Sequence, residues 1–154
     1  INSKEKTGSV GSICPEIRAP KFCDDVLGEF SPRYLTACQQ ALNAEFRGDL
    51  ELAAIGYRSA LECVVKDYAI KELGKRSEEV VGKSLFAAIG EYLSEQRELL
   101  NTADVVRLIG NDYTHYERKY PEYDFDLLKQ YFNIFTAFLR MKVSAAHPPL
   151  SRKK

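Results

Sequence analysis

The sequence predicts an all-α domain, and three observations support this prediction. Between residues 31 and 144, apolar residues recur at three- and four-residue steps, which is the period of one face of an α-helix. Residues that start and stop helices, Ser31-Pro32, Gly48 and Gly74, stand at the borders of these stretches. No run of five residues alternates apolar and polar side chains with β-branched content, so a sheet is not expected.

Five main helices are expected, which cover about residues 31–47, 49–73, 84–98, 101–116 and 124–144. Ser31, Asp49 and Asp124 are their expected N-caps, and Pro121 breaks the chain before the last helix. Because the connections between these helices are short, the sequence predicts a five-helix up-and-down bundle.

The two ends of the chain lack this period. Residues 1–30 are expected to form an irregular N-terminal arm that contains Cys14 and Cys23, and residues 145–154 a flexible tail. The helical bundle domain is thus assigned to residues 31–144. No signal peptide is visible in residues 1–12, and no apolar run approaches the roughly 18–20 residues of a membrane span.

The composition limits the classes of partner and cofactor. Lys+Arg and Asp+Glu both number 22, and this balance argues against broad nucleic-acid binding, although it allows a local basic cleft. The four cysteines form no C-x-x-C pair, and His115 and His147 are the only histidines, so neither a metal site nor a cofactor is expected. Cys38 and Cys63 fall inside helical patterns and are expected to be buried, reduced thiols, which fits a cytoplasmic protein.

Three polar residues with complementary chemistry, Arg107, Asn111 and His115, are spaced four apart, which would place them on one face of the fourth helix. Arginine can hold a phosphate with two hydrogen bonds, histidine can act as acid or base near neutral pH, and asparagine can orient either of them. Metal-free ribonuclease chemistry needs such groups, and a second copy across a two-fold axis would complete the set.

The segment that contains Arg107, Asn111 and His115 also has a purely structural interpretation. Gly110 in the middle of a helix costs about 1 kcal/mol relative to alanine, and the usual reason is close approach of another helix. Asn111 and His115 would then satisfy backbone groups at that crossing. In the second helix, Arg58 and Glu62 form either a solvated i,i+4 pair or a partly buried pair that ties two helices together.

Aromatic and basic residues mix directly after this segment. Tyr113, Arg118 and Lys119 belong to a stretch that can stack on and grip single-stranded nucleic acid, or form a solvated helix end with aromatic packing. The stretch is therefore a candidate RNA-binding element.

The order Arg58-Ser-Ala-Leu-Glu62, then Arg107-Leu-Ile-Gly-Asn-Asp-Tyr-Thr-His115, then a final amphipathic helix resembles the domain-of-unknown-function family 4145. That family is placed in the HEPN superfamily of helical domains, and it often occurs with zinc ribbons or restriction-system subunits in bacteria. The resemblance covers about residues 31–142. It implies a helical bundle that pairs through its motif-bearing helices. Asn111 and His115 match the polar residue and the histidine of the superfamily's ribonucleases, whereas Gly110 stands where those have arginine.

Three functions follow as hypotheses. The first is a HEPN-like domain of a bacterial defence or nucleic-acid-associated protein that forms homodimers and binds RNA. The second is a metal-independent endoribonuclease with a composite site across a dimer, in which Arg107, Asn111 and His115 carry the reaction. The third is a non-catalytic structural accessory domain of a larger protein. Self-association is expected through the fourth helix, because Gly110 would let a second helix approach closely.

Overall fold

The computed structural model describes residues 24–153, and within them the chain forms helices and no strand. The helices are α1 (Asp25–Phe30), α2 (Pro32–Phe46), α3 (Leu50–Lys71), α4 (Ser77–Val81), α5 (Leu85–Tyr92), α6 (Arg97–Asp112) and α7 (Phe125–Ala146). The all-α prediction is confirmed, although this region contains seven helices where five main ones were expected. Most of the expected arm, with Cys14 and Cys23, lies outside the described residues.

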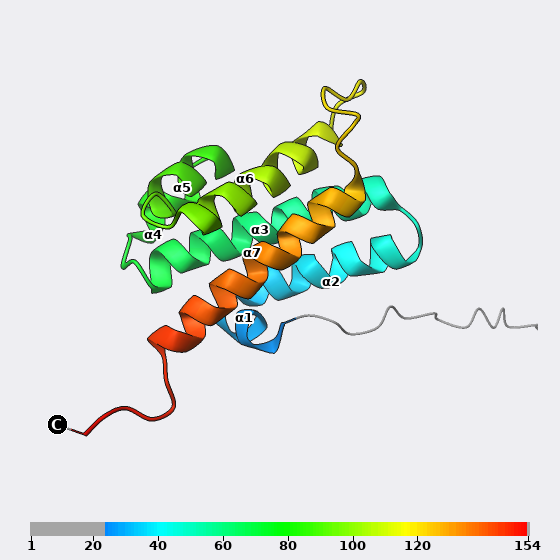
Figure 1. Cartoon of the computed structure of the whole chain (residues 1–154). Coiled ribbons are helices and arrows are strands. Elements are labelled where there is room, and N and C mark those ends of the chain that lie inside the picture. The colour runs from blue at the N-terminus through cyan, green and yellow to red at the C-terminus, as the bar shows by residue number, and fades with distance from the viewer. Residues whose placement is uncertain (1–23, 154) are drawn as a thin grey trace, which may run out of the picture.

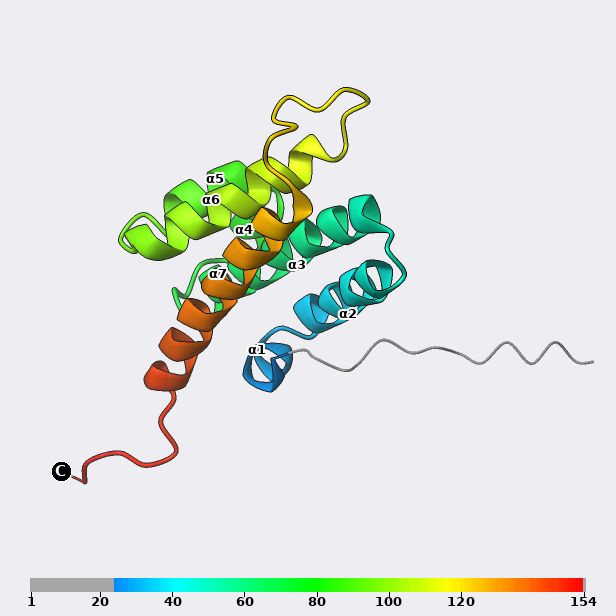
Figure 2. The same ribbon diagram turned by 45° about the vertical axis from the view of Figure 1, so that its right-hand side comes forward.

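Helix α3 lies at the centre of the bundle and packs against α2, α5, α6 and α7 (Figure 1). The chain reverses between α2 and α3 at Gly48, whose φ of 82° favours glycine, and the two helices run side by side. A longer connection, residues 113–124, joins α6 to α7 and projects from one end of the bundle (Figures 1 and 2).

Two of the expected N-caps make cap hydrogen bonds. The Ser31 hydroxyl accepts a hydrogen bond from the Tyr34 backbone N–H over 3.3 Å, and Pro32 follows as the first helical residue. The Asp124 carboxylate accepts from the Leu127 N–H over 3.0 Å. Asp49 occupies the N-cap position of α3, but its side chain makes no cap hydrogen bond.

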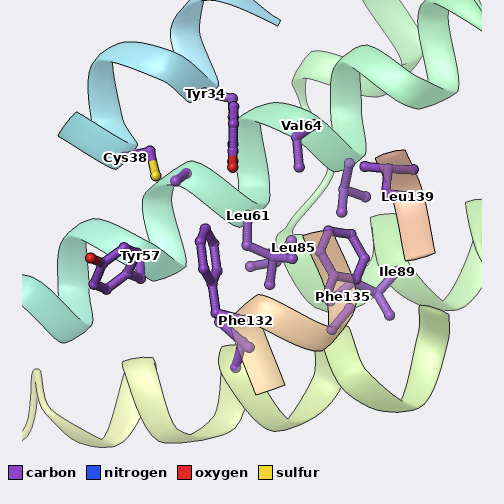
Figure 3. Close-up of a cluster of buried hydrophobic side chains, with 14 of the residues drawn as sticks. Tyr34, Cys38, Tyr57, Leu61, Val64, Leu85, Ile89, Phe132, Phe135 and Leu139 are labelled. Atoms are coloured by element: carbon purple, nitrogen blue, oxygen red, sulfur yellow. The ribbon is translucent and has the colours of Figure 1, made fainter. Parts of the chain in front are cut away.

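The hydrophobic core gathers around the buried face of α3 (Figure 3). The aromatic side chains of three helices meet there: the Tyr57 and Phe132 ring centroids lie 4.8 Å apart, and Tyr34 stacks on Phe132 at 6.4 Å. Such aromatic pairs add to the free energy that area burial supplies. The core therefore joins α2 and α7 to α3 and to each other.

Two short helices were not expected. Helix α1 lies in the part of the chain assigned to the irregular arm; Asp24 caps it, and its Leu27 is fully buried. Helix α4 lies between the second and third expected helices, and its Val80 is fully buried. Each is too short for a 3.6-residue period to be recognised in the sequence.

Four helix boundaries also differ from expectation. Helix α5 ends at Tyr92, and α6 begins at Arg97 after a turn in which the Gln96 N–H donates to the Leu93 carbonyl over 2.9 Å. Helix α6 ends at Asp112 instead of about residue 116. Helix α7 continues to Ala146, so the first two residues of the expected tail are helical. None of the described helices has the length and apolarity that crossing a membrane requires.

Candidate functional site

Gly110 marks the place where α6 comes closest to α3. A Cβ atom added at Gly110 would lie only 2.6 Å from the Cβ of Arg58, so any larger residue would force the two helices apart. The close approach inferred from Gly110 is thus made by α3 of the same chain. Gly110 is fully packed within the monomer, and it does not offer the docking position for a second copy that the sequence suggested.

The Arg58 side chain ties α3 to α6. Its Nε donates to the Asn111 Oδ1 over 2.5 Å, and its Nη1 lies 3.2 Å from the Glu62 Oε2. The side chains of Arg58 and Glu62 are 24% and 31% exposed, so they form a half-buried pair that is neither fully solvated nor sealed. Lys66 is the next charged residue that pairs with Glu62. Its ammonium lies 2.9 Å from the Glu62 carboxylate and donates to the Val81 carbonyl over 3.2 Å.

Arg107 points to a different helix. Its Nε lies 2.8 Å from the Asp104 Oδ1, and its guanidinium lies over the Phe86 ring of α5, 5.0 Å from the centroid. The Arg107 side chain is only 13% exposed. Its charge is therefore already paired on the α5 side of α6, while Asn111 bonds to α3.

His115 is not part of α6. Since that helix ends at Asp112, His115 lies in the turn that follows, where its N–H donates to the Asp112 carbonyl and its side chain is exposed. The expected row of Arg107, Asn111 and His115 on one helical face is therefore wrong. The three side chains are directed to α5, to α3 and to the solvent, and one protomer does not assemble them into a site.

Asp112 is the residue that the sequence interpretation missed. Its side chain is buried, 2% exposed, and it accepts hydrogen bonds from the backbone N–H of Lys119 over 2.6 Å and of Tyr120 over 3.1 Å. It also lies 3.1 Å from the Arg118 Nε. A carboxylate in the last turn of a helix interacts unfavourably with the helix dipole. The position of Asp112 at the end of the fourth expected helix was therefore the one sign in the sequence that this carboxylate has partners elsewhere.

The pKa of the Asp112 carboxyl is lowered from its ordinary value. Burial by itself would raise this pKa, but the hydrogen bonds from the Lys119 and Tyr120 amides, together with the charge and hydrogen bond of Arg118, outweigh it. Asp112 is thus ionised at neutral pH. Its hydrogen bonds and ion pair hold residues 118–120 against the end of α6. The helix therefore ends at Asp112, and the connection folds back towards it.

Arg118 and Tyr113, two of the expected RNA contacts, make contacts within the connection between α6 and α7 that stabilise its conformation. The Arg118 guanidinium lies 4.1 Å from the centroid of the Tyr113 ring, and its Nη2 donates to the carbonyls of Tyr120 and Tyr123. Both groups are only half-exposed. Of the three residues proposed for binding, Lys119 alone has an exposed side chain, since only its backbone N–H is bonded to Asp112.

The connection between α6 and α7, hereafter the display loop (residues 113–124), presents aromatic and basic side chains at its surface. Tyr116 is fully exposed, and His115 and Lys119 of the same loop are also exposed. Tyr120 and Tyr123 are 40% and 46% exposed, with ring centroids 6.2 Å apart. The loop thus offers flat rings and one free ammonium at the end of the bundle from which it projects (Figure 1).

A groove of about 680 Å³ runs between α2 and α7, over the side chains of α3. At one end the Lys129 ammonium lies 2.5 Å from both the Glu45 carboxylate and the Tyr57 hydroxyl, and at the other Arg140 pairs with Asp24 at 3.3 Å. These pairs neutralise the charges of Lys129, Arg140 and Asp24 at the two ends of the groove. Its floor belongs to the aromatic core that Figure 3 shows.

The described residues suggest neither a metal centre nor a reactive thiol. No group of three or more His, Cys, Asp or Glu side chains that could hold a metal ion occurs in residues 24–153. Cys38 is buried and Cys63 half-buried, and both are free thiols. Burial raises the pKa of the Cys63 thiol, which disfavours the thiolate that nucleophilic chemistry would need.

Comparison with known proteins gives one match. The model of the family described as "Domain of unknown function (DUF4145)" matches residues 39–153, about three quarters of the chain. The matched segment includes most of α2, all of α3 to α7 and the display loop. No curated protein and no solved structure matches the chain.

Proposed function

This chain belongs to the DUF4145 family, and we propose that it is a HEPN-like helical module that self-associates and binds single-stranded RNA through the display loop. We place it in the cytoplasm, within a bacterial defence or nucleic-acid-associated protein. The free thiols of Cys38 and Cys63 fit reducing conditions. The observation that carries the proposal is the fully exposed Tyr116 on a loop fastened at its base by Asp112.

An anchored loop lowers the cost of binding. Ordering a free loop on association consumes conformational entropy, but Asp112 and Arg118 already fix the display loop in the free protein. Every base has a flat face, so an exposed ring such as Tyr116 can stack on an unpaired base whatever its identity. His115, its neighbour in the chain, and Lys119 in the same loop are also exposed, and both can donate hydrogen bonds to phosphate or base edges.

The charges of the display loop predict how the affinity for RNA depends on salt and on sequence. Lys119 is an exposed cation in the display loop, Arg118 is paired with Asp112, and Glu117 and Glu122 are acidic. Few phosphates can be neutralised, so affinity should depend only weakly on salt, with a slope of about 0.7 per phosphate contact. We therefore expect stacking to dominate the affinity and binding to show little dependence on sequence.

Fluorescence anisotropy with a labelled single-stranded RNA tests the proposal. Tyr116→Ala should weaken binding about 5- to 140-fold, because one base stack contributes about 1–3 kcal/mol. Lys119→Ala should weaken it on the order of fivefold at 0.1 M salt. The matched controls are Phe46→Ala, a half-exposed ring at the end of α2, and Lys75→Ala, an exposed lysine before α4. Equal affinity of Tyr116→Ala and the wild type, or no binding by the wild type, would overturn RNA binding by this loop.

Metal-independent ribonuclease activity is the second candidate, and the exposure of His115 favours it, since an acid–base group has to reach the substrate. For this activity Arg107 would have to leave Asp104 and Phe86, and Asn111 would have to leave Arg58. RNA incubated with the protein and a chelator should stay intact under the leading proposal. Cleavage that His115→Ala abolishes would support the ribonuclease, and self-association without RNA binding would support a structural accessory domain.

A further inference from the structure

Helix α7 carries a second apolar stripe in addition to the one that faces the core. The core stripe consists of Phe125, Leu128, Phe132, Phe135, Leu139 and Val143, all of them buried. The second stripe consists of Leu127, Tyr131, Ile134, Phe138 and Met141, which are separated by steps of four, three, four and three residues. That spacing keeps them in line along one side of a helix, as in a helix–helix seam.

The second stripe is accessible to solvent. Phe138 is 37% and Met141 64% exposed, while Leu127, Tyr131 and Ile134 are half-buried. Figures 1 and 2 show α7 on the outside of the bundle, and no other described element lies over its outer side. The row is about 21 Å long. Leu127 and Tyr131 pack in part against the core, and the rest of its surface, largest at Phe138 and Met141, is open to solvent in the described part of the chain.

Helix α7 itself carries little charge along this stripe. Between Asp126 and Arg140, the only charged residue of α7 is Lys129, which turns away to bond Glu45 and Tyr57. The most exposed positions of those turns include Gln130, Asn133 and Ala137. A solvated helix normally carries charged residues on its outer face, whereas the centres of protein interfaces are depleted of them.

We propose that this stripe, Leu127 to Met141, is the surface through which two copies of the chain associate, with their α7 helices antiparallel and a two-fold axis beside Ile134. The inference rests on the self-association proposed above and names the surface for it. A two-fold contact places the same patch of both copies face to face, so the patch has to be complementary to itself. With the axis beside Ile134, Leu127 of one copy lies opposite Met141 of the other, because both are seven residues from Ile134.

The charges at the two ends of α7 favour a second copy of the chain as the partner, and they favour an antiparallel orientation of the two α7 helices. The helix begins with the acidic residues Asp124, its cap, and Asp126, and its last turns carry Lys142, whereas Arg140 is already paired with Asp24 within the chain. An antiparallel pair places each acidic end beside the basic end of the other copy, and it also opposes the two helix dipoles. A parallel pair would bring like charges together.

Sedimentation of the whole chain at tens of micromolar tests the surface. The wild type should be a dimer, Met141→Glu and Phe138→Glu should be monomers, and the control Leu52→Glu should stay a dimer, because Leu52 is 62% exposed on α3. The melting temperatures of the variants at low concentration show whether they are folded. A monomeric wild type would overturn self-association itself. A dimer that persists in both folded α7 variants would overturn this surface alone.

A disulfide test locates the axis. A residue beside a two-fold axis faces its own copy, so Ile134→Cys should form a cross-linked dimer on oxidation, whereas Leu52→Cys should not. The unsubstituted chain, run in parallel, gives the background from its native cysteines. Cross-linking of Leu52→Cys but not of Ile134→Cys would contradict the proposed arrangement even if the chain is dimeric.

Discussion

The two halves of the segment Arg107–His115 have different surroundings in the fold. The helical half packs against the bundle: Gly110 sits against Arg58, Asn111 bonds to Arg58, and Arg107 is paired with Asp104. The half after Asp112 leaves the helix and belongs to the display loop, where His115 is exposed. A spacing of four residues made these halves look like one site. The comparison shows that a helix end between two residues can separate what an ideal helix would align.

Gly110→Ala tests the packed half, and its effect should be among the largest. The added Cβ would meet the Arg58 Cβ at 2.6 Å, and this atom cannot move without its helix, so we expect a loss of about 1–3 kcal/mol in the free energy of unfolding. Gly90→Ala is the matched control, because a Cβ added at this glycine inside α5 meets nothing within 4 Å. It should be neutral or add up to about 1 kcal/mol. Urea denaturation that gives both variants equal stability would contradict the close contact.

Asp112→Asn tests the anchor of the display loop, and its effect should depend on pH. The folded-state pKa of Asp112 lies below the value of about 3.9 for an unfolded chain, so its ionisation stabilises the fold above about pH 4. That contribution is lost as the pH falls through the folded-state pKa. The wild type should therefore exceed Asp112→Asn in stability at pH 7, and this difference should shrink below about pH 4. Glu95→Gln, at an exposed position between α5 and α6, is the control, and a difference that stays constant with pH would argue against the anchor.

A double-mutant cycle of Arg58→Ala and Asn111→Ala measures the bond between α3 and α6. We expect each single variant to lose about 1–3 kcal/mol, because each leaves a half-buried polar partner, and a coupling energy of about 1 kcal/mol. Urea denaturation of the four proteins gives the coupling. Additive losses would show that the hydrogen bond contributes nothing of its own.

His115→Ala should have the smallest effect on stability. Its side chain is exposed, so the free energy of unfolding should change by less than about 0.5 kcal/mol. The melting temperature therefore separates the two original interpretations of this residue. A loss of about 1–3 kcal/mol would indicate a structural histidine with a buried partner.

Much of the fold could be predicted from patterns among residues that are close in the sequence. Ser31-Pro32 and Asp124 cap their helices as expected, because a cap depends on residues within one turn of each other. The stripes of α2, α3 and α7 were visible because these helices are long. Helix α1 has six residues and α4 five, which is less than two turns, so neither is long enough for a helical period to be recognised in the sequence.

The candidate site was less predictable, because its decisive contacts are not local. Arg58 and Asn111 are 53 residues apart in the sequence, and nothing in the order of residues pairs them. The partners of Asp112 lie six to eight residues along an irregular connection, where no repeat indicates which amide meets the carboxylate. Without that contact the pattern allowed α6 to continue to residue 116, and so it placed His115 on the wrong element.

The most direct test of the division between the two halves is an NMR titration of the wild-type protein with single-stranded RNA. We expect the signals of His115, Tyr116 and Lys119 to shift on addition of RNA, while the Arg58 Nε–H and the Asn111 side-chain amide keep their positions. Shifts of the Arg58 and Asn111 signals with none in the display loop would contradict the account, because the RNA site would then lie in the half that we describe as part of the packed bundle.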